Sequence, residues 1–209
     1  MIVSVKQNFV FLCMPKCAST STEAILRPFG QLVTKNGPRF KHMNMRTYER
    51  LVKPLVVNWS RKRAAGPRDI EVICLFREPI DWLHSWYRYR KRPDLINSKK
   101  SQNSTAHVDF VEFARQYASK NPPPFAKLGR QSEFIKDRKG NVDKVRLFRY
   151  EDYPDFLAYM SAKVGKELIA PHLNVSPEGE NIDLAKLGFL VDFFREDYAI
   201  YNGLLVDKI

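Results

Sequence analysis

Three short apolar runs recur along the chain, each followed by turn residues and then by a stretch of mixed apolar and polar positions. The runs are nearly continuous rather than alternating, which is typical of strands buried on both faces of a parallel sheet. The first two of the following stretches begin with hydroxyl residues or with proline, which favour the first turn of a helix. The predicted strands, each with the helix that follows it, are residues 8–13 with 19–27, 71–76 with 80–90, and 144–148 with 156–164.

Strand–turn–helix units in series predict an α/β fold around a parallel sheet. The remaining elements that we expect are helices at residues 45–57, 108–119 and 184–201 and loops at residues 93–105 and 121–125. Neither loop divides the chain, and the sequence holds no internal repeat or low-complexity tract. We therefore expect residues 1–209 to form a single domain.

The excess of basic over acidic residues favours one class of binding partner. The chain has 35 Lys and Arg residues against 23 Asp and Glu residues, a net charge of +12, which favours anionic partners such as nucleic acid, acidic membranes or phosphate and sulfate groups. No stretch approaches the ~20 apolar residues that a membrane span needs. Gln7 and Asn8 interrupt the first apolar run, so that run is interpreted as a strand and not as a signal peptide. We expect a soluble, cytoplasmic protein without stable membrane insertion.

The three cysteines form no CxxC pair, and their odd number argues against a disulfide framework and against a zinc site. Cys13 and Cys74 lie in apolar runs and are expected in the core. Cys17 lies in a polar loop beside Lys16, where a helix start can lower the pKa of a thiol. A cysteine nucleophile would also need a histidine within reach, which a sequence alone does not show. No metal ion is expected.

The loop Pro15-Lys16-Cys17-Ala18-Ser19-Thr20-Ser21 is the first candidate site. Ligands of open α/β sheets bind where the carboxyl ends of strands meet helix N-termini, and the free N–H groups there suit phosphate or sulfate. Lys16 adds a full charge, and Ser19, Thr20 and Ser21 add hydroxyl donors. The order differs from the GxxxxGK[ST] loop of nucleotide triphosphatases, since lysine comes first and glycine is absent. The alternative interpretation is an ordinary helix cap beside a surface lysine.

A second candidate site follows the strand at residues 71–76. Arg77 stands at the end of this strand, and Ser85 lies eight residues later on the next predicted helix. A guanidinium group can grip a phosphate with two parallel hydrogen bonds. Arg88 and Arg90 add to the positive field. The alternative for Arg77 is a salt bridge with one of the acidic residues that follow it, Glu78 or Asp81.

Together the two segments resemble sulfotransferases that use 3′-phosphoadenosine 5′-phosphosulfate (PAPS). The segment PKCASTS is similar to the 5′-phosphosulfate-binding loop of that family, and the segment with Arg77 and Ser85 is similar to its 3′-phosphate-binding element. Cytosolic members commonly have glycine where this chain has Ala18, so the resemblance points away from the hormone-and-phenol branch and towards carbohydrate-type, Golgi-like or bacterial members. Alanine is also less suited than glycine to a left-handed backbone at this position.

The resemblance implies a P-loop-NTPase-like three-layer sandwich with a central parallel sheet flanked by helices. It implies transfer of a sulfuryl group from PAPS to a hydroxyl or amine acceptor, with a carbohydrate such as an anionic glycan as the candidate, and release of 3′-phosphoadenosine 5′-phosphate. The acceptor itself and the oligomeric state are not readable from the sequence.

The resemblance also assigns roles to single residues. Lys16 is expected to contact the bridging oxygen and the transferring sulfonate, and His42 to act as the catalytic base, with Glu23 and Glu78 as fallback bases. Tyr150, in the segment Tyr-Glu-Asp that follows the third strand, is expected to contact the adenine. The expected PAPS-binding residues are Lys16, Cys17, Ala18, Ser19, Thr20, Ser21, Arg77, Ser85 and Tyr150. Asn174 and Ser176 are similar to a late loop of carbohydrate-type members.

Two other function classes compete with this interpretation. A nucleotide kinase or other P-loop NTPase would need its glycine-rich GK[ST] order and a magnesium-binding aspartate after a strand, and the sequence shows neither clearly. A nucleic-acid-binding module is suggested by the net charge and by aromatic residues among arginines at residues 86–92, but no recognised nucleic-acid motif is present. We therefore expect no nucleic-acid partner.

Overall fold

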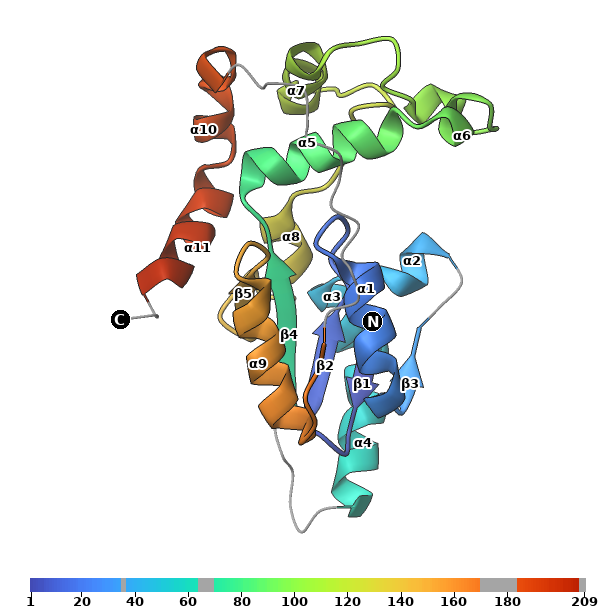
Figure 1. Cartoon of the computed structure of the whole chain (residues 1–209), viewed down its shortest axis with the longest axis vertical. Helices are drawn as coiled ribbons and strands as arrows, with labels where there is room; N and C mark the ends of the chain where they lie inside the picture. The colour runs from blue at the N-terminus through green and yellow to red at the C-terminus, as the bar shows by residue number, and fades with distance from the viewer. Residues whose placement is uncertain (35–36, 64–69, 170–183, 207–209) are drawn as a thin grey trace.

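A five-stranded sheet forms the centre of the protein (Figure 1). The computed structural model describes residues 1–34, 37–63, 70–169 and 184–206. The strands are β1 (Ile2–Ser4), β2 (Phe9–Leu12), β3 (Leu32–Val33), β4 (Glu71–Phe76) and β5 (Val145–Arg149), in the spatial order β3-β1-β2-β4-β5. β2, β4 and β5 are parallel neighbours, with Leu12 opposite Cys74 and Phe76 opposite Arg149. The predicted parallel centre of an α/β fold is therefore confirmed.

The sheet edge at the N-terminus differs from the prediction. β1 pairs antiparallel with both β2 and β3, so the sheet is mixed and not wholly parallel. The polar residues that interrupt the first apolar run make a turn, and Ser4 is paired with Phe9 across it. Asn8 has φ of 56° in this turn, a left-handed conformation that asparagine tolerates better than most residues. The polar residues Gln7 and Asn8 were visible in the sequence. That the short strand β1 before them pairs with both β2 and β3 follows only from the folded sheet.

Helices cover both faces of the sheet and one end of it. They are α1 (Ser19–Leu26), α2 (Pro38–Lys41), α3 (Met45–Leu51), α4 (Lys53–Arg63), α5 (Pro79–Arg90), α6 (Pro93–Ile96), α7 (Phe110–Ala118), α8 (Gln131–Ile135), α9 (Tyr153–Val164), α10 (Phe189–Phe193) and α11 (Arg195–Val206), with 3-10 turns at Arg27–Phe29, Ser101–Asn103 and Leu184–Leu187. In Figure 1, α1 and α9 lie in front of the sheet and α3 and α8 behind it, which gives three layers. α5 crosses above the carboxyl ends of β2 and β4.

Three predicted elements have other boundaries than expected. The helix expected at residues 45–57 is divided into α3 and α4, because Pro54 has no N–H to continue the hydrogen-bond ladder of α3. The helix expected at residues 184–201 is likewise divided into a 3-10 turn, α10 and α11. The loop expected at residues 93–105 contains α6 and a 3-10 turn.

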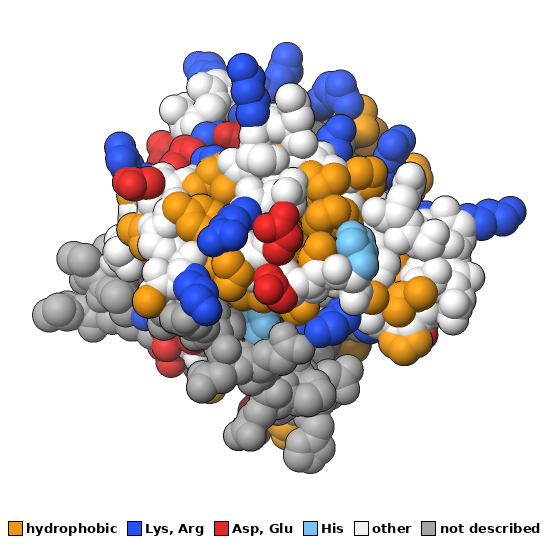
Figure 2. All heavy atoms as spheres, turned by 90° about the horizontal axis from the view of Figure 1, so that it is seen from above, with side chains coloured by type: hydrophobic (Ala, Val, Ile, Leu, Met, Phe, Trp, Pro, Cys, Tyr) orange, Lys and Arg blue, Asp and Glu red, His pale blue; other side chains and the backbone are white. Residues whose placement is uncertain are grey.

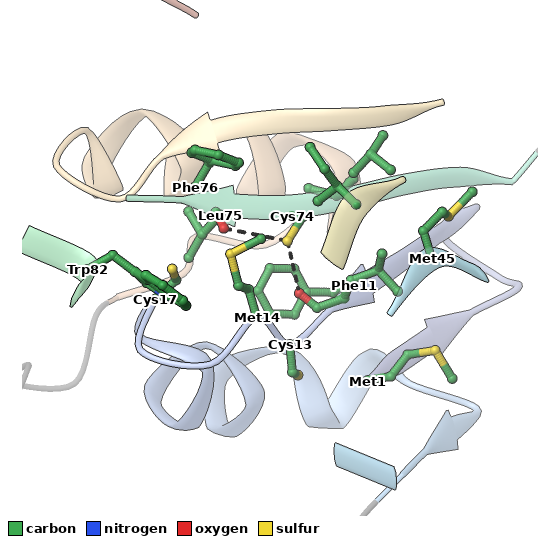
Figure 3. Packing of buried hydrophobic residues seen from close by; sticks show 14 of the residues in the cluster. Met1, Phe11, Cys13, Met14, Cys17, Met45, Cys74, Leu75, Phe76 and Trp82 are labelled. Atoms are coloured by element: carbon green, nitrogen blue, oxygen red, sulfur yellow. Dashed lines mark hydrogen bonds between the residues drawn. The ribbon is translucent and has the colours of Figure 1, made fainter. Parts of the chain in front are cut away.

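The core explains why the strand sequences are nearly continuously apolar. All four residues of β2 are at most 1% exposed, and so are Ile73 to Phe76 of β4, since helices cover both faces of these strands. Figure 3 shows Phe11, Met14 and Cys74 packed between the sheet and its neighbours. Cys13 and Cys74 are fully buried, as predicted. No helix in the described ranges has the length and apolar character needed to cross a bilayer.

Candidate functional site

A cavity of about 570 Å³ opens beside the loops that follow β2 and β4. The sequence-predicted residues that line it are Lys16, Ala18, Ser19, Thr20, Ser21, His42, Arg77, Ser85 and Tyr150. Segments more than a hundred residues apart thus meet at one place, because the carboxyl ends of parallel strands share one edge of a sheet. Among the described residues that line the cavity, none is acidic, whereas five are Lys or Arg.

The loop after β2 has a left-handed backbone at two non-glycine positions. Lys16 has φ of 66°, and Ala18, the residue before α1, has φ of 49° and ψ of 21°. The left-handed region costs a residue with a Cβ about 1–2 kcal/mol, so the alanine takes the conformation for which glycine is better suited. Such strain persists where surrounding contacts impose it and is concentrated at functional sites. Because alanine has no side-chain acceptor, the first-turn N–H groups of α1 are not capped by Ala18 as in an ordinary capping turn.

Lys16 lies in a strongly positive environment. Burial, together with the charges of Arg77, Arg92 and Arg88, lowers the pKa of Lys16 to about 8. Its Nζ lies 4.4 Å from the centre of the Tyr89 ring, a cation–π contact. An anion in the cavity would favour the charged form of the amine and raise its pKa again. The position is therefore suited to a ligand with negative charge.

Lys41 is a cavity residue that the sequence analysis missed. Its Nζ donates to the Thr20 hydroxyl at 3.0 Å and lies 3.5 Å from a carboxylate oxygen of Glu23. Glu23 is also hydrogen-bonded to Arg27 at 2.5 Å. Burial acts to raise the pKa of Glu23, but the bonds to Arg27 and Lys41 outweigh it and the pKa is lowered. Glu23 thus holds Lys41 at the cavity as an ion-pair partner, and this occupied carboxylate is poorly suited to serve as the fallback base.

Arg77 forms the salt bridge that the sequence left open and also lines the cavity. Its side chain is held by Asp81, with Nε 2.6 Å from Oδ2, and its Nη1 donates to the carbonyl oxygen of Lys16 at 3.0 Å. The guanidinium carbon also lies 4.3 Å from the centre of the Tyr150 ring. The salt bridge is therefore real, and the residue still lines the cavity beside Ser85. The Tyr150 ring, which was expected to contact the adenine, packs against the guanidinium group of Arg77 in this arrangement.

His42 has the arrangement of a general base. Its Nδ1 is 2.7 Å from the carbonyl oxygen of Cys13. A carbonyl oxygen can only accept, so Nδ1 carries the proton and Nε2 keeps its lone pair in the neutral ring. Burial lowers the pKa of His42 below its ordinary value, although the bond to Cys13 acts in the opposite direction. The ring is therefore neutral at pH 7 and can take up a proton at Nε2.

Cys17 lies in the polar loop after β2, but its side chain is buried. The residue is 1% exposed, and Figure 3 shows it beside Trp82, on the inner side of the loop. Its Sγ lies 3.5 Å from Oε1 of Gln131. Burial raises the pKa of the Cys17 thiol well above its ordinary value, the opposite of the lowering considered from the sequence. The loop curls so that Lys16 faces the cavity while Cys17 faces the core, which leaves only the backbone of Cys17 available to a ligand.

The remaining candidate residues lie elsewhere. His84 is buried against Tyr87 and Phe110 and does not line the cavity, whereas its neighbour Ser85 does. Glu78, the other fallback base, caps α5 by accepting from the N–H of Asp81 and is not part of the cavity wall. Asn174 and Ser176 lie outside the described residues.

Figure 2 shows Lys and Arg side chains around much of the outline of this end of the molecule. No three His, Cys, Asp or Glu side chains gather as a possible metal site within the part of the chain that the structure describes.

No family model matches the chain, and no curated protein sequence matches it. A solved structure, that of a sulfotransferase from Alicyclobacillus acidocaldarius, is similar with 16% sequence identity and a TM-score of 0.45, over 92% of each chain. At this identity and TM-score we base the function proposed below on the residues of the cavity.

Proposed function

We propose that this protein is a PAPS-dependent sulfotransferase that transfers a sulfuryl group to a hydroxyl or amine acceptor. The observation that carries the proposal is the single cavity lined by both segments that resemble the family: the loop with Lys16 and the element with Arg77 and Ser85. PAPS bears anionic groups at its 5′ and 3′ ends. A cavity with two separate cationic donor sets and no acidic wall residue among the described ones fits such a ligand.

The residues divide between the two ends of the donor. The N–H groups at the start of α1, the hydroxyls of residues 19–21 and the Lys16 ammonium would hold the 5′-phosphosulfate. Arg77 and Ser85 would hold the 3′-phosphate. Arg77 is suited to this role because Asp81, the carbonyl of Lys16 and the Tyr150 ring already fix its orientation, so little side-chain freedom is lost on binding.

Catalysis in this site would depend on positioning and electrostatics. PAPS supplies the sulfuryl group, which is transferred as the S–O bond to the acceptor forms and the S–O bond to the phosphate breaks. Lys16 would neutralise the charge that develops on the leaving phosphate. His42 would accept the proton of the acceptor hydroxyl at Nε2, with Nδ1 fixed on the carbonyl of Cys13. A carbohydrate is the acceptor that we propose, because the wall beyond the loops presents Trp86 and Tyr89 together with Lys100 and Asn103.

The direct test is a pair of measurements. Calorimetry with 3′-phosphoadenosine 5′-phosphate should show binding to the wild type and strongly weakened binding to Lys16→Ala and Arg77→Ala. Arg195→Ala, at an exposed position of α11, is the matched control and should bind normally. Transfer of ³⁵S-sulfate from labelled PAPS to a panel of glycans should then identify the acceptor class. Absence of wild-type binding to 3′-phosphoadenosine 5′-phosphate would refute the proposal. Binding without transfer to any glycan would refute only the acceptor class.

A further inference from the structure

Gln131, the first residue of α8, is buried and contacts residues of both candidate anion-binding segments. It is 1% exposed, and its side-chain amide is hydrogen-bonded on both sides. Oε1 accepts from the backbone N–H of Arg77 at 2.9 Å, and Nε2 donates to the backbone carbonyl of Arg77 at 2.8 Å. The Cys17 Sγ lies 3.5 Å from the same Oε1. One side chain therefore contacts the loop after β2 and the residue after β4.

The two bonds to Arg77 replace a strand neighbour. Arg77 follows the last residue of β4, and its backbone groups are buried where the sheet ends. A buried backbone N–H or C=O without a partner costs about as much as a lost hydrogen bond. The amide of Gln131 offers one donor and one acceptor side by side, so it pairs with Arg77 as a strand residue would. This fixes the backbone from which the Arg77 side chain reaches the cavity.

Gln131 is itself held from the opposite side by α11. Asp197 is fully buried and accepts from the N–H of Ser132 at 3.0 Å and from its hydroxyl at 3.1 Å. Because Ser132 is the next residue in the chain, these bonds fix the start of α8 and hence the base of the Gln131 side chain. The chain of contacts runs from α11 through α8 to Arg77 without passing through the cavity.

Two further hydrogen bonds join the loop after β2 to the segment after β4. Arg77 Nη1 donates to the carbonyl of Lys16 at 3.0 Å, and Trp82 Nε1 donates to the carbonyl of Pro15 at 3.0 Å. Gln131 adds a separate link between the same two segments, because it contacts the Cys17 side chain in one and the backbone of Arg77 in the other.

We propose that Gln131 is a positioning residue that fixes the two anion-binding loops in one arrangement. The proposal rests on the function proposed above and adds that the spacing of the two anion sites is set by a residue that contacts neither anion. Removal of the Gln131 amide should weaken the binding of a ligand that occupies both anion sites more than the binding of a ligand that occupies one. 3′-Phosphoadenosine 5′-phosphate is the first kind of ligand and adenosine 5′-monophosphate is the second.

The variants are Gln131→Met, which keeps the volume without the amide, and Gln131→Glu, which keeps the shape. Gln116→Met, on the outer helix α7, is the matched control. We expect Gln131→Met to weaken 3′-phosphoadenosine 5′-phosphate on the order of 10- to 100-fold, as when residues that orient ligating side chains are removed. The loss for adenosine 5′-monophosphate should be smaller, and the control should change neither affinity. Calorimetry measures both.

The pH dependence of the affinity of Gln131→Glu distinguishes a loss of hydrogen bonds from a loss of packing, because packing does not change with protonation. A neutral carboxylic acid can accept from the N–H of Arg77 and donate to its carbonyl, whereas a carboxylate can only accept. The affinity of Gln131→Glu relative to wild type, measured at the same pH, should therefore recover as the pH is lowered from 8 to 5. A ratio that does not change with pH would contradict the positioning role.

Amide hydrogen exchange makes the test independent of the ligand. In Gln131→Met the amides of residues 16–21 and of Arg77 should exchange faster than in the wild type, while those in Gln116→Met should not. If the wild type binds no 3′-phosphoadenosine 5′-phosphate, the proposed function fails and exchange alone decides on Gln131. If Gln131→Met does not fold, the same comparison is made with Gln131→Glu at pH 8. Unchanged exchange in residues 16–21 would overturn the proposal. If the wild type binds, an affinity of Gln131→Met within about threefold of that of the control Gln116→Met would also overturn it.

Discussion

Replacement of Arg77 by alanine is the most informative single perturbation of the proposed site. The side chain is 9% exposed and makes three contacts, with Asp81, with the carbonyl of Lys16 and with the Tyr150 ring. Its removal takes away the proposed phosphate contact and leaves the Asp81 carboxylate beside the place where the phosphate would bind. The substitution therefore replaces attraction by repulsion at one point.

The structure sets the magnitude. A hydrogen bond to a charged group contributes about 1.5–3 kcal/mol, and truncation of one partner of a buried charged contact costs about 2–5 kcal/mol. The Asp81 side chain is 43% exposed, so solvent screens its repulsion and the lower half of that range applies. We expect a loss of about 2–3.5 kcal/mol, which is roughly 30- to 400-fold in the Kd of 3′-phosphoadenosine 5′-phosphate.

A double-mutant cycle separates the two contributions. Calorimetry is performed on wild type, Arg77→Ala, Asp81→Asn and the double variant. Asp81→Asn added to Arg77→Ala should recover about 0.5–1 kcal/mol, because it removes the exposed negative charge. If Arg77→Ala binds within about threefold of wild type while its thermal unfolding is unchanged, Arg77 does not contact the ligand and the reasoning is refuted.

Four further predictions follow from the site. His42→Ala should keep its affinity for 3′-phosphoadenosine 5′-phosphate while turnover falls by ~10² to 10⁴. In the wild type kcat/KM should decline only below pH 6.5, because the lowered pKa keeps His42 unprotonated above that pH. An unchanged turnover in His42→Ala would show that His42 is not the base. Anion affinity should decrease as the pH rises through about 8, where Lys16 loses its proton, and Lys16→Met should flatten that dependence in calorimetric titrations at several pH values. Ala18→Gly should raise the free energy of unfolding by about 0.5–1 kcal/mol in thermal denaturation, since relief of the left-handed alanine outweighs the entropy of glycine, whereas the control Ala106→Gly should lower it. The three buried cysteines should not react with a thiol reagent at pH 8 until the protein is unfolded, and rapid labelling of Cys17 in the native protein would contradict its buried position.

Sequence alone determined the parts of this protein that depend on local chemistry. Continuous apolar runs identified β2 and β4 within one residue, because strands covered on both faces can hold few polar side chains. The shorter apolar segment at residues 144–148 located β5 within one residue as well, although only Val145 of this edge strand is buried. Proline and hydroxyl residues located the starts of α1 and α5. The same strand–turn–helix pattern placed Lys16 and Arg77 after the carboxyl ends of two strands, and the carboxyl ends of parallel strands lie at one edge of the sheet.

The tertiary structure decided what each side chain faces. Within the loop after β2, Lys16 is directed to the cavity and Cys17 to the core, because two left-handed residues curl the backbone, and residue type alone does not predict that curl. Lys41 reaches the cavity only through its bonds to Glu23 and Thr20, and the tautomer of His42 depends on a carbonyl 29 residues away. Gln131 had no motif around it at all. Contacts between distant segments carry no local signature, since they arise only when the packed core brings those segments together.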